Sequence, residues 1–268
     1  MALRPNPKDI ATFGAYDVGQ FARWLRAGLE GYLVNKTGVG SFRPLWYCML
    51  QEHSLFGDLE NIYDDFSAPQ KAMIRQAVVL LLKELPVEQK YEPVFGVLLD
   101  FAAAISAVDV LSSIPARGEG FLILEPVNQD TPSLYSRALH LVVNLANPIA
   151  DARPCIERLI GASDSFSCDD AWWALIGLCR VAPEEFVKHV GLLRGHLVRN
   201  LKKWQPTEQG QLNLAGYLVS AVGPDRIKAD LPVAVQEMGL GPADAGLEVD
   251  DPVSGLVDMF SRLKKVEA

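Results

Sequence analysis

A pairing of alanine and proline that occurs twice restricts the fold of this chain more than any other feature. Ala174 is followed nine positions later by Pro183, and Ala215 is followed nine positions later by Pro224. The two copies therefore lie 41 residues apart (215 − 174 = 41). The same interval relates other apolar residues of matching type: Leu178 and Val219, Val181 and Val222, Phe186 and Ile227, Val190 and Leu231. A helix, a turn marked by proline and a second helix, repeated once, account for both copies.

Two further segments show the pairing less regularly. Ala77 precedes Pro86 by nine positions, and Ala138 lies 36 residues before Ala174 (174 − 138 = 36). A period of this size, built of paired helices, is typical of α-solenoids. The sequence therefore predicts an all-α fold, a right-handed α-solenoid of helix pairs.

This architecture resembles that of HEAT and armadillo repeat proteins over residues 67–238. The resemblance concerns the paired helices and carries over no catalytic residue. It implies a scaffold, an adaptor or a binding platform whose inner helices present a concave surface.

The domain organisation follows from the same pattern. We expect a flexible N-terminal tail over residues 1–14 and a single solenoid domain over 15–268. Near 115–132 glycines and prolines interrupt the helical periodicity. This interruption is either a long loop or one short extended segment, and it is either functional or a plain insertion between repeats. Over 183–204 the pattern predicts one long helix, and over 252–265 an amphipathic closing helix.

Charge and hydropathy narrow the classes of function. A net charge of −8 at pH 7 disfavours binding to nucleic-acid phosphates and suits a basic protein partner. The first residues lack the apolar run of a secretory signal, and no segment approaches the roughly 18 apolar residues needed to span a bilayer. We expect a cytoplasmic protein without membrane contact.

No motif for catalysis, metal or cofactor emerges from the sequence. Gly38 and Gly40 lack the third glycine of a dinucleotide fingerprint, and no nucleophile elbow occurs. The four cysteines are too widely spaced for a zinc site and are expected to be reduced core residues: Cys48, Cys155, Cys168 and Cys179. We predict no cofactor and no metal, and we favour a non-enzymatic role. The alternative is an enzyme whose site, in a helical groove, is assembled without a linear motif.

Two groups of residues are candidates for partner binding. The first is an apolar stripe at positions i, i+4 and i+7 of one helix, formed by Trp172, Ile176 and Cys179. The equivalent stripe 41 residues later contains polar groups, so an exposed stripe here would be a hot spot for a partner. The alternative is that a neighbouring helix or the 115–132 segment covers it.

The second group is a cationic strip on the predicted 183–204 helix. Its members share neighbouring faces of that helix: Lys188, His189, His196, Arg199 and Lys202. On an inner helix this strip could hold an acidic peptide or a phosphate, and weak nucleic-acid binding through Lys188–Lys203 is a further alternative. The plain alternative is a solvated helix face with cations near its C-terminus.

The function that we expect is therefore a non-enzymatic protein–protein interaction module. It would act as a scaffold, an adaptor or an inhibitor of immunity type, through a helical-repeat surface presented to a partner.

Overall fold

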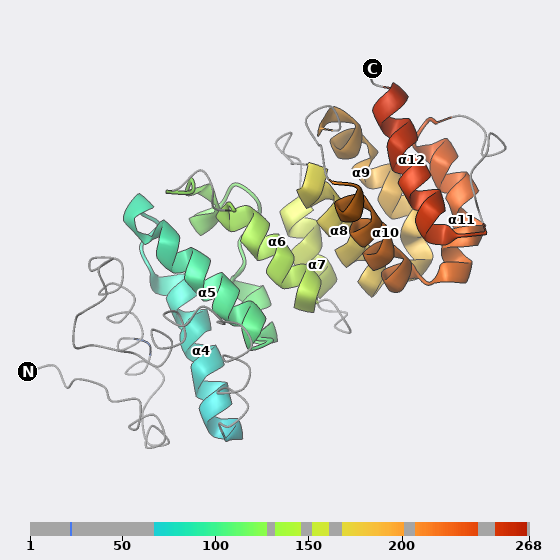
Figure 1. The fold of residues 1–268 in the computed structure, drawn as a ribbon. Coiled ribbons are helices and arrows are strands. Elements are labelled where there is room, and N and C mark those ends of the chain that lie inside the picture. Colours follow the sequence, from blue (N-terminus) through green and yellow to red (C-terminus); the bar gives the residue numbers. More distant parts are fainter. Residues whose placement is uncertain are drawn as a thin grey trace, which may run out of the picture. The chain divides into compact units, whose positions relative to one another are not determined.

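The described part of this chain is helical throughout. The computed structural model describes residue 22 and residues 67–127, 132–145, 152–160, 168–200, 207–240 and 250–266. All regular secondary structure in these residues is α-helix or 3₁₀-helix, which confirms the all-α class (Figure 1). None of the described helices is long and apolar enough to cross a membrane. The predicted tail over 1–14 lies outside the described residues.

The chain divides into two compact units. The first unit is Met1–Leu141 and the second is Val142–Ala268, so the boundary falls within α6 (Leu134–Leu145). The single domain that the sequence predicts over 15–268 stays a prediction.

A helix pair forms the centre of the described first unit. α4 (Ala68–Glu84) contacts α5 (Glu92–Ala104), and the short 3₁₀-helix η2 (Gln89–Tyr91) lies between them in the chain. Pro93 lies in the first turn of α5, where a missing N–H breaks no helical hydrogen bond. A second 3₁₀-helix, η3 (Val108–Ser113), packs on α4. The pairing of Ala77 with Pro86 therefore marks a helix and the turn that follows it.

The interruption near 115–132 contains no extended strand in its described part. It forms a 3₁₀-helix, η4 (Gly120–Ile123), whose Phe121 ring stacks on Phe95 with centroids 4.7 Å apart. The backbone N–H of Val127 donates to the buried carboxylate of Glu92 at 3.2 Å. The described part of this segment is thus a loop packed against α5.

The second unit contains the repeated pairs that the sequence predicts. Its helices after α6 follow in this order: α7 (Ala152–Ile160), α8 (Cys168–Val181), η5 (Pro183–Glu185), α9 (Phe186–Asn200), α10 (Glu208–Val222), α11 (Pro224–Glu237) and α12 (Pro252–Val266). α8 packs on α10 and α9 packs on α11, so each helix contacts its equivalent in the next pair. The packing is compatible with a helical repeat architecture.

Contacts along α9 and α11 show that these two helices run in the same direction. A Cβ atom added to Gly191 would lie 3.6 Å from the Glu237 carboxylate, and one added to Gly239 would lie 3.0 Å from the Arg194 guanidinium. Both contacts advance together toward the C-terminal ends. Parallel second helices are expected where one unit repeats the last.

Local signals set the ends of these helices. The long helix predicted over 183–204 starts as η5 and continues as α9, and residues 201–206 lie outside the described part. The Thr207 hydroxyl accepts a hydrogen bond from the N–H of Gly210 at 3.1 Å and caps α10. Gly223, with φ of 96°, ends α10 in a conformation that strains any residue with a side chain. α11 continues through Pro232, where the sequence led us to expect a bend or a break.

Two cysteines of the second unit provide a test of core burial. Cys155 and Cys179 are buried free thiols, and burial raises the pKa of both, to about 11 for Cys155. Because the thiolate is the reactive form, we expect neither to react with iodoacetamide at about pH 8 in the native protein and both to react in urea. Peptide mass mapping checks this, and rapid alkylation of either cysteine in the native protein would contradict it.

Candidate functional site

The apolar stripe proposed as a partner hot spot is buried, so that prediction is wrong in its premise of exposure. Trp172 is 1% exposed, and Ile176 and Cys179 are 0% exposed. The Trp172 ring lies against Phe260 of α12, with ring centroids 4.0 Å apart. The stripe is core because α12 packs in the second unit; the alternative of cover by a neighbouring helix is the one observed.

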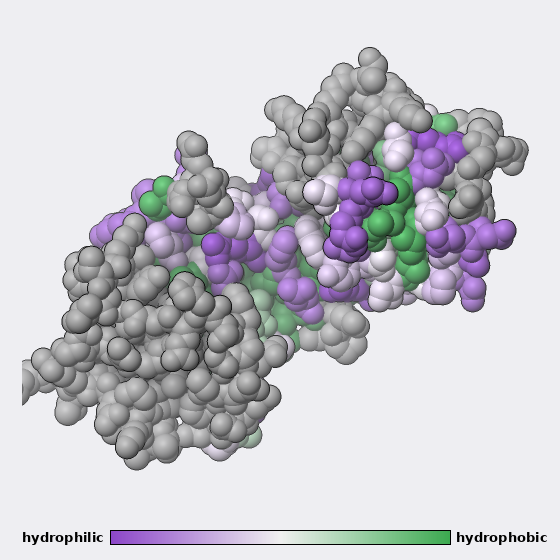
Figure 2. Space-filling model, in the orientation of Figure 1, coloured by the Kyte–Doolittle hydropathy of each residue, from purple (hydrophilic) through white to green (hydrophobic). Residues whose placement is uncertain are grey.

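α12 also contacts α10, its neighbour in Figure 1. On the face drawn in Figure 2, a band of apolar surface runs between these two helices with hydrophilic residues on either side. α12 therefore contributes to the surface of the second unit as well as to its core.

The cationic strip is only partly assembled by α9. The Lys188 side chain is 69% exposed, whereas His189 is 3% exposed and belongs to the core. His189 falls on the buried side of α9 because it neighbours Val190, which faces α8 and α11. His196 is half-buried. The side chain of Arg199 and the whole of Lys202 lie outside the described residues.

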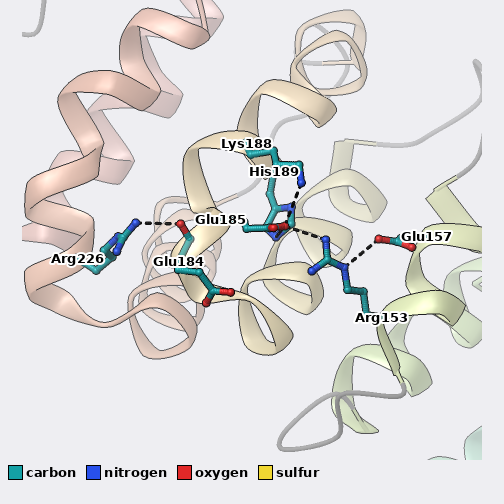
Figure 3. Close-up of polar contacts among 7 residues, drawn as sticks. All are labelled: Arg153, Glu157, Glu184, Glu185, Lys188, His189 and Arg226. Carbon is teal, nitrogen blue, oxygen red and sulfur yellow. Dashed lines mark hydrogen bonds and ion pairs between the residues drawn. The ribbon is translucent and has the colours of Figure 1, made fainter.

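The structure instead brings together a polar group at the turn between α8 and α9, which we call the turn cluster. Its members come from α7, η5 and α9: Arg153, Glu157, Glu185, Lys188 and His189 (Figure 3). The Arg153 guanidinium donates to Glu185 at 2.8 Å and to Glu157 at 3.0 Å. The Lys188 ammonium lies 3.4 Å from the Glu185 carboxylate. The cluster therefore ties the turn to α7.

A second link ties the same turn to α11. The Arg226 guanidinium donates to the backbone carbonyl of Glu184 at 2.9 Å (Figure 3), and it also pairs with Asp230 on its own helix. Because η5 connects two helices of one pair and Arg226 belongs to the next, this hydrogen bond joins successive pairs. Sequence analysis treated Glu184 and Glu185 only as first-turn acids and did not identify Arg153 or Arg226.

Electrostatics in the turn cluster keep the carboxylates ionised. Burial alone would raise the pKa of the Glu185 carboxyl, but hydrogen bonds from Arg153 and Lys188 outweigh it and lower that pKa below the usual range. Hydrogen bonds to Glu157 and Glu185 raise the pKa of Arg153 in turn. The cluster is therefore a set of ion pairs at neutral pH.

His189 is the unusual member. Burial lowers the pKa of its imidazole although Glu185 favours the charged form. Its Nε2 atom is buried without a hydrogen-bond partner, 3.8 Å from the Glu185 carboxylate, and its ring is hydrogen-bonded to the backbone of Ala182. A histidine next to a carboxylate resembles an acid–base pair, but a side chain this buried does not reach a substrate. Its place in the core supports a structural role.

A second pairing of histidine with a carboxyl lies in the first unit. Asp100 on α5 pairs with Arg137 on α6, and His140 also lies close enough to affect it. Burial raises the pKa of the Asp100 carboxyl although Arg137 and His140 lower it. The described residues contain no group of three or more His, Cys, Asp or Glu side chains arranged to hold a metal ion.

Acid should destabilise the protein through His189. Because its pKa in the folded state is below the ordinary 6.5, the unfolded state binds the proton more readily. Stability is then complete above pH 6.5 and falls as the pH decreases toward the lower native pKa. The lowered pKa of Glu185 adds a separate loss below its ordinary 4.5. We expect His189→Asn, which does not titrate, to flatten the upper part of this dependence.

Thermal unfolding of both proteins at several pH values between the two windows measures this effect. The matched control is His140→Asn, at an exposed histidine of α6, which should retain the wild-type profile. A His189→Asn profile that parallels the wild type would show that His189 is not the titrating group.

Two exposed apolar side chains were missed by sequence analysis. Leu192 of α9 is 60% exposed and Val233 of α11 is 47% exposed. They lie at equivalent positions of successive pairs (233 − 192 = 41). The repeat interval could have found them, because a position that is apolar in both copies and outside the core-facing set is unusual on a solvated helix face.

Comparison with protein-family models, with curated proteins and with solved structures gives no match.

Proposed function

We propose that this chain is a non-enzymatic protein-interaction module, a right-handed α-solenoid of the HEAT or armadillo kind that presents a helical-repeat surface to a protein partner. The observation that supports it is the packing of like on like in the second unit, α8 on α10 and α9 on α11. In this arrangement one unit displaces the next without closing a bundle.

Such stacking has a direct consequence for binding. Equivalent positions of successive pairs come to the same face, so a residue type kept at one position becomes an extended feature of the surface. Leu192 and Val233 are an example, since both are exposed and apolar. Large exposed apolar residues in neighbouring repeats are what a protein partner contacts most profitably.

The turn cluster fits this role as a fastener. Arg153 and Arg226 bind the same turn from the preceding and the following helix pair. Exposed ion pairs contribute little to stability individually, typically 0–1 kcal/mol, but they fix the register of elements that they connect. A surface assembled from several helices needs that register to keep its shape.

Capture experiments with the intact chain test the proposal. We expect tagged full-length protein to recover a specific protein partner from native extract, and Phe260→Ala, which disrupts the core, to lose it. Gly216→Ala, at an open helical position, should retain the partner. Recovery of no specific partner under several conditions would count against an interaction module.

A further inference from the structure

We infer that the α9 and α11 faces form a docking strip for an acidic, amphipathic helix of the partner protein. This inference rests on the proposed function and names the partner's chemistry. The outer strip consists of three exposed positions on each helix, related by the 41-residue interval (229 − 188 = 233 − 192 = 236 − 195 = 41): Lys188, Leu192 and Gly195 of α9 with Ala229, Val233 and Gln236 of α11.

The apolar content of the strip lies at its centre. Leu192 and Val233 are the two large apolar side chains, and each exposes about half of its area or more. Gly195 and Ala229, also exposed, have the smallest side chains on the strip. Small neighbours leave room for a partner's side chains on either side of the two anchors.

The spacing of the anchors suits a helix that lies across the pair. Packed helices have axes about 8–10 Å apart, and residues i and i+7 of a helix are separated by about 10.5 Å along its axis. A partner helix crossing α9 and α11 can therefore place two apolar residues, one heptad apart, on Leu192 and Val233. This is the helix-in-groove mode of recognition.

Charge decides the polar face of the partner. α9 carries Lys188, Arg194 and Arg199 and no carboxylate between residues 186 and 200. The strip positions of α11 are uncharged, and the Glu237 carboxylate lies beside Gly191 at the far end of that helix. Glu185 partly neutralises Lys188 from 3.4 Å, yet it lies before the strip in the chain. A partner with glutamates or aspartates around its apolar anchors complements this surface better than a basic one.

The local charge thus differs from that of the whole chain. A net charge of −8 suggested a basic partner, but a partner meets the surface that it contacts. The strip is cationic although the protein is acidic, because exposed carboxylates such as Asp225 and Asp251 lie outside it.

A peptide of defined composition tests the strip. The probe is an 18-residue amphipathic peptide with leucines at i, i+4 and i+7 and glutamates on its polar face; the comparison peptide has lysine at every glutamate. Fluorescence anisotropy with the full-length chain should show the acidic peptide binding at least about tenfold more tightly, with affinity that falls as salt rises. Equal affinity for the two peptides would overturn the inference.

Variants locate the binding. Leu192→Ser and Val233→Ser should each weaken the acidic peptide roughly tenfold, without a change in thermal stability because both side chains are exposed. Leu212→Ser, at a position 38% exposed on α10, is the matched control and should bind like the wild type. Unchanged affinity in Leu192→Ser, or an oligonucleotide that binds the same strip more tightly than the peptide, would overturn it.

The strip and the module can fail separately. A native partner that is captured equally by wild type and by the Leu192→Ser, Val233→Ser double variant contradicts the strip and leaves the module. An extract that yields no partner contradicts the module itself.

Discussion

Truncation of Phe260 to alanine should destabilise the second unit by about 3–5 kcal/mol. The Phe260 ring is fully buried and lies 4.0 Å, centroid to centroid, from the ring of Trp172. Removing it takes away apolar contact area and leaves a cavity against an aromatic ring that has no other way to fill it. Of the described side chains, these two join the last helix to α8, so the loss should affect the whole unit.

Urea unfolding, followed by far-UV circular dichroism and by tryptophan fluorescence, measures this loss. The matched control is Val257→Ala on the same helix, where the side chain is only half-buried and the cost should stay near or below about 1 kcal/mol. A shift for Phe260→Ala no larger than that of the control would show that α12 does not depend on this contact.

Gly177→Ala should destabilise the second unit although alanine is the better helix former. A Cβ atom at residue 177 would lie 2.8 Å from Cγ2 of Val143 and 3.1 Å from Cδ1 of Ile156. The valine is β-branched and stiff, so the helices must separate to admit the new methyl. Overpacking of this kind costs typically 1–3 kcal/mol, against a gain of about 1 kcal/mol in helix propensity.

Gly216→Ala provides the contrast within the same unit. A Cβ atom there meets nothing within 4 Å, so the propensity gain is unopposed and the variant should be stabilised by about 0.5–1 kcal/mol. Opposite signs for the two substitutions are the expected result of urea unfolding. A Gly177→Ala variant as stable as Gly216→Ala would show that α8 does not approach Val143 and Ile156 this closely.

Much of the fold could be predicted from the chain because its signals act within one or two turns. Pro183 and Pro224 mark turns where the ring is tolerated only at a helix start, and Thr207 caps α10 through a bond to a residue three positions on. The apolar face of the closing helix appears at Leu256, Met259 and Phe260, all fully buried. Equal spacing of such local signals in two segments is itself a sequence property, so the 41-residue interval was visible.

The candidate site could not be predicted in the same way. Trp172 looked like an exposed hot spot because its own helix offers two apolar faces, and nothing nearby in the chain says which of them is covered. Its cover, Phe260, lies 88 positions later (260 − 172 = 88). His189 looked accessible for the same reason, and the links of Arg153 and Arg226 to one turn join segments 32 and 42 residues apart.

Helix ends, turns and periodicity depend on backbone conformation and on neighbours within a turn, and those neighbours are present in any stretch of the chain. Burial and ion pairing depend on which surfaces meet after the helices pack, and a helix with apolar residues on two sides can bury either one. For this protein, local sequence therefore sufficed for the rods and their repeat. Only the packing of α12, α7 and α11 around α8 and α9 distinguishes the residues that hold the unit together from those, such as Leu192 and Val233, that it exposes.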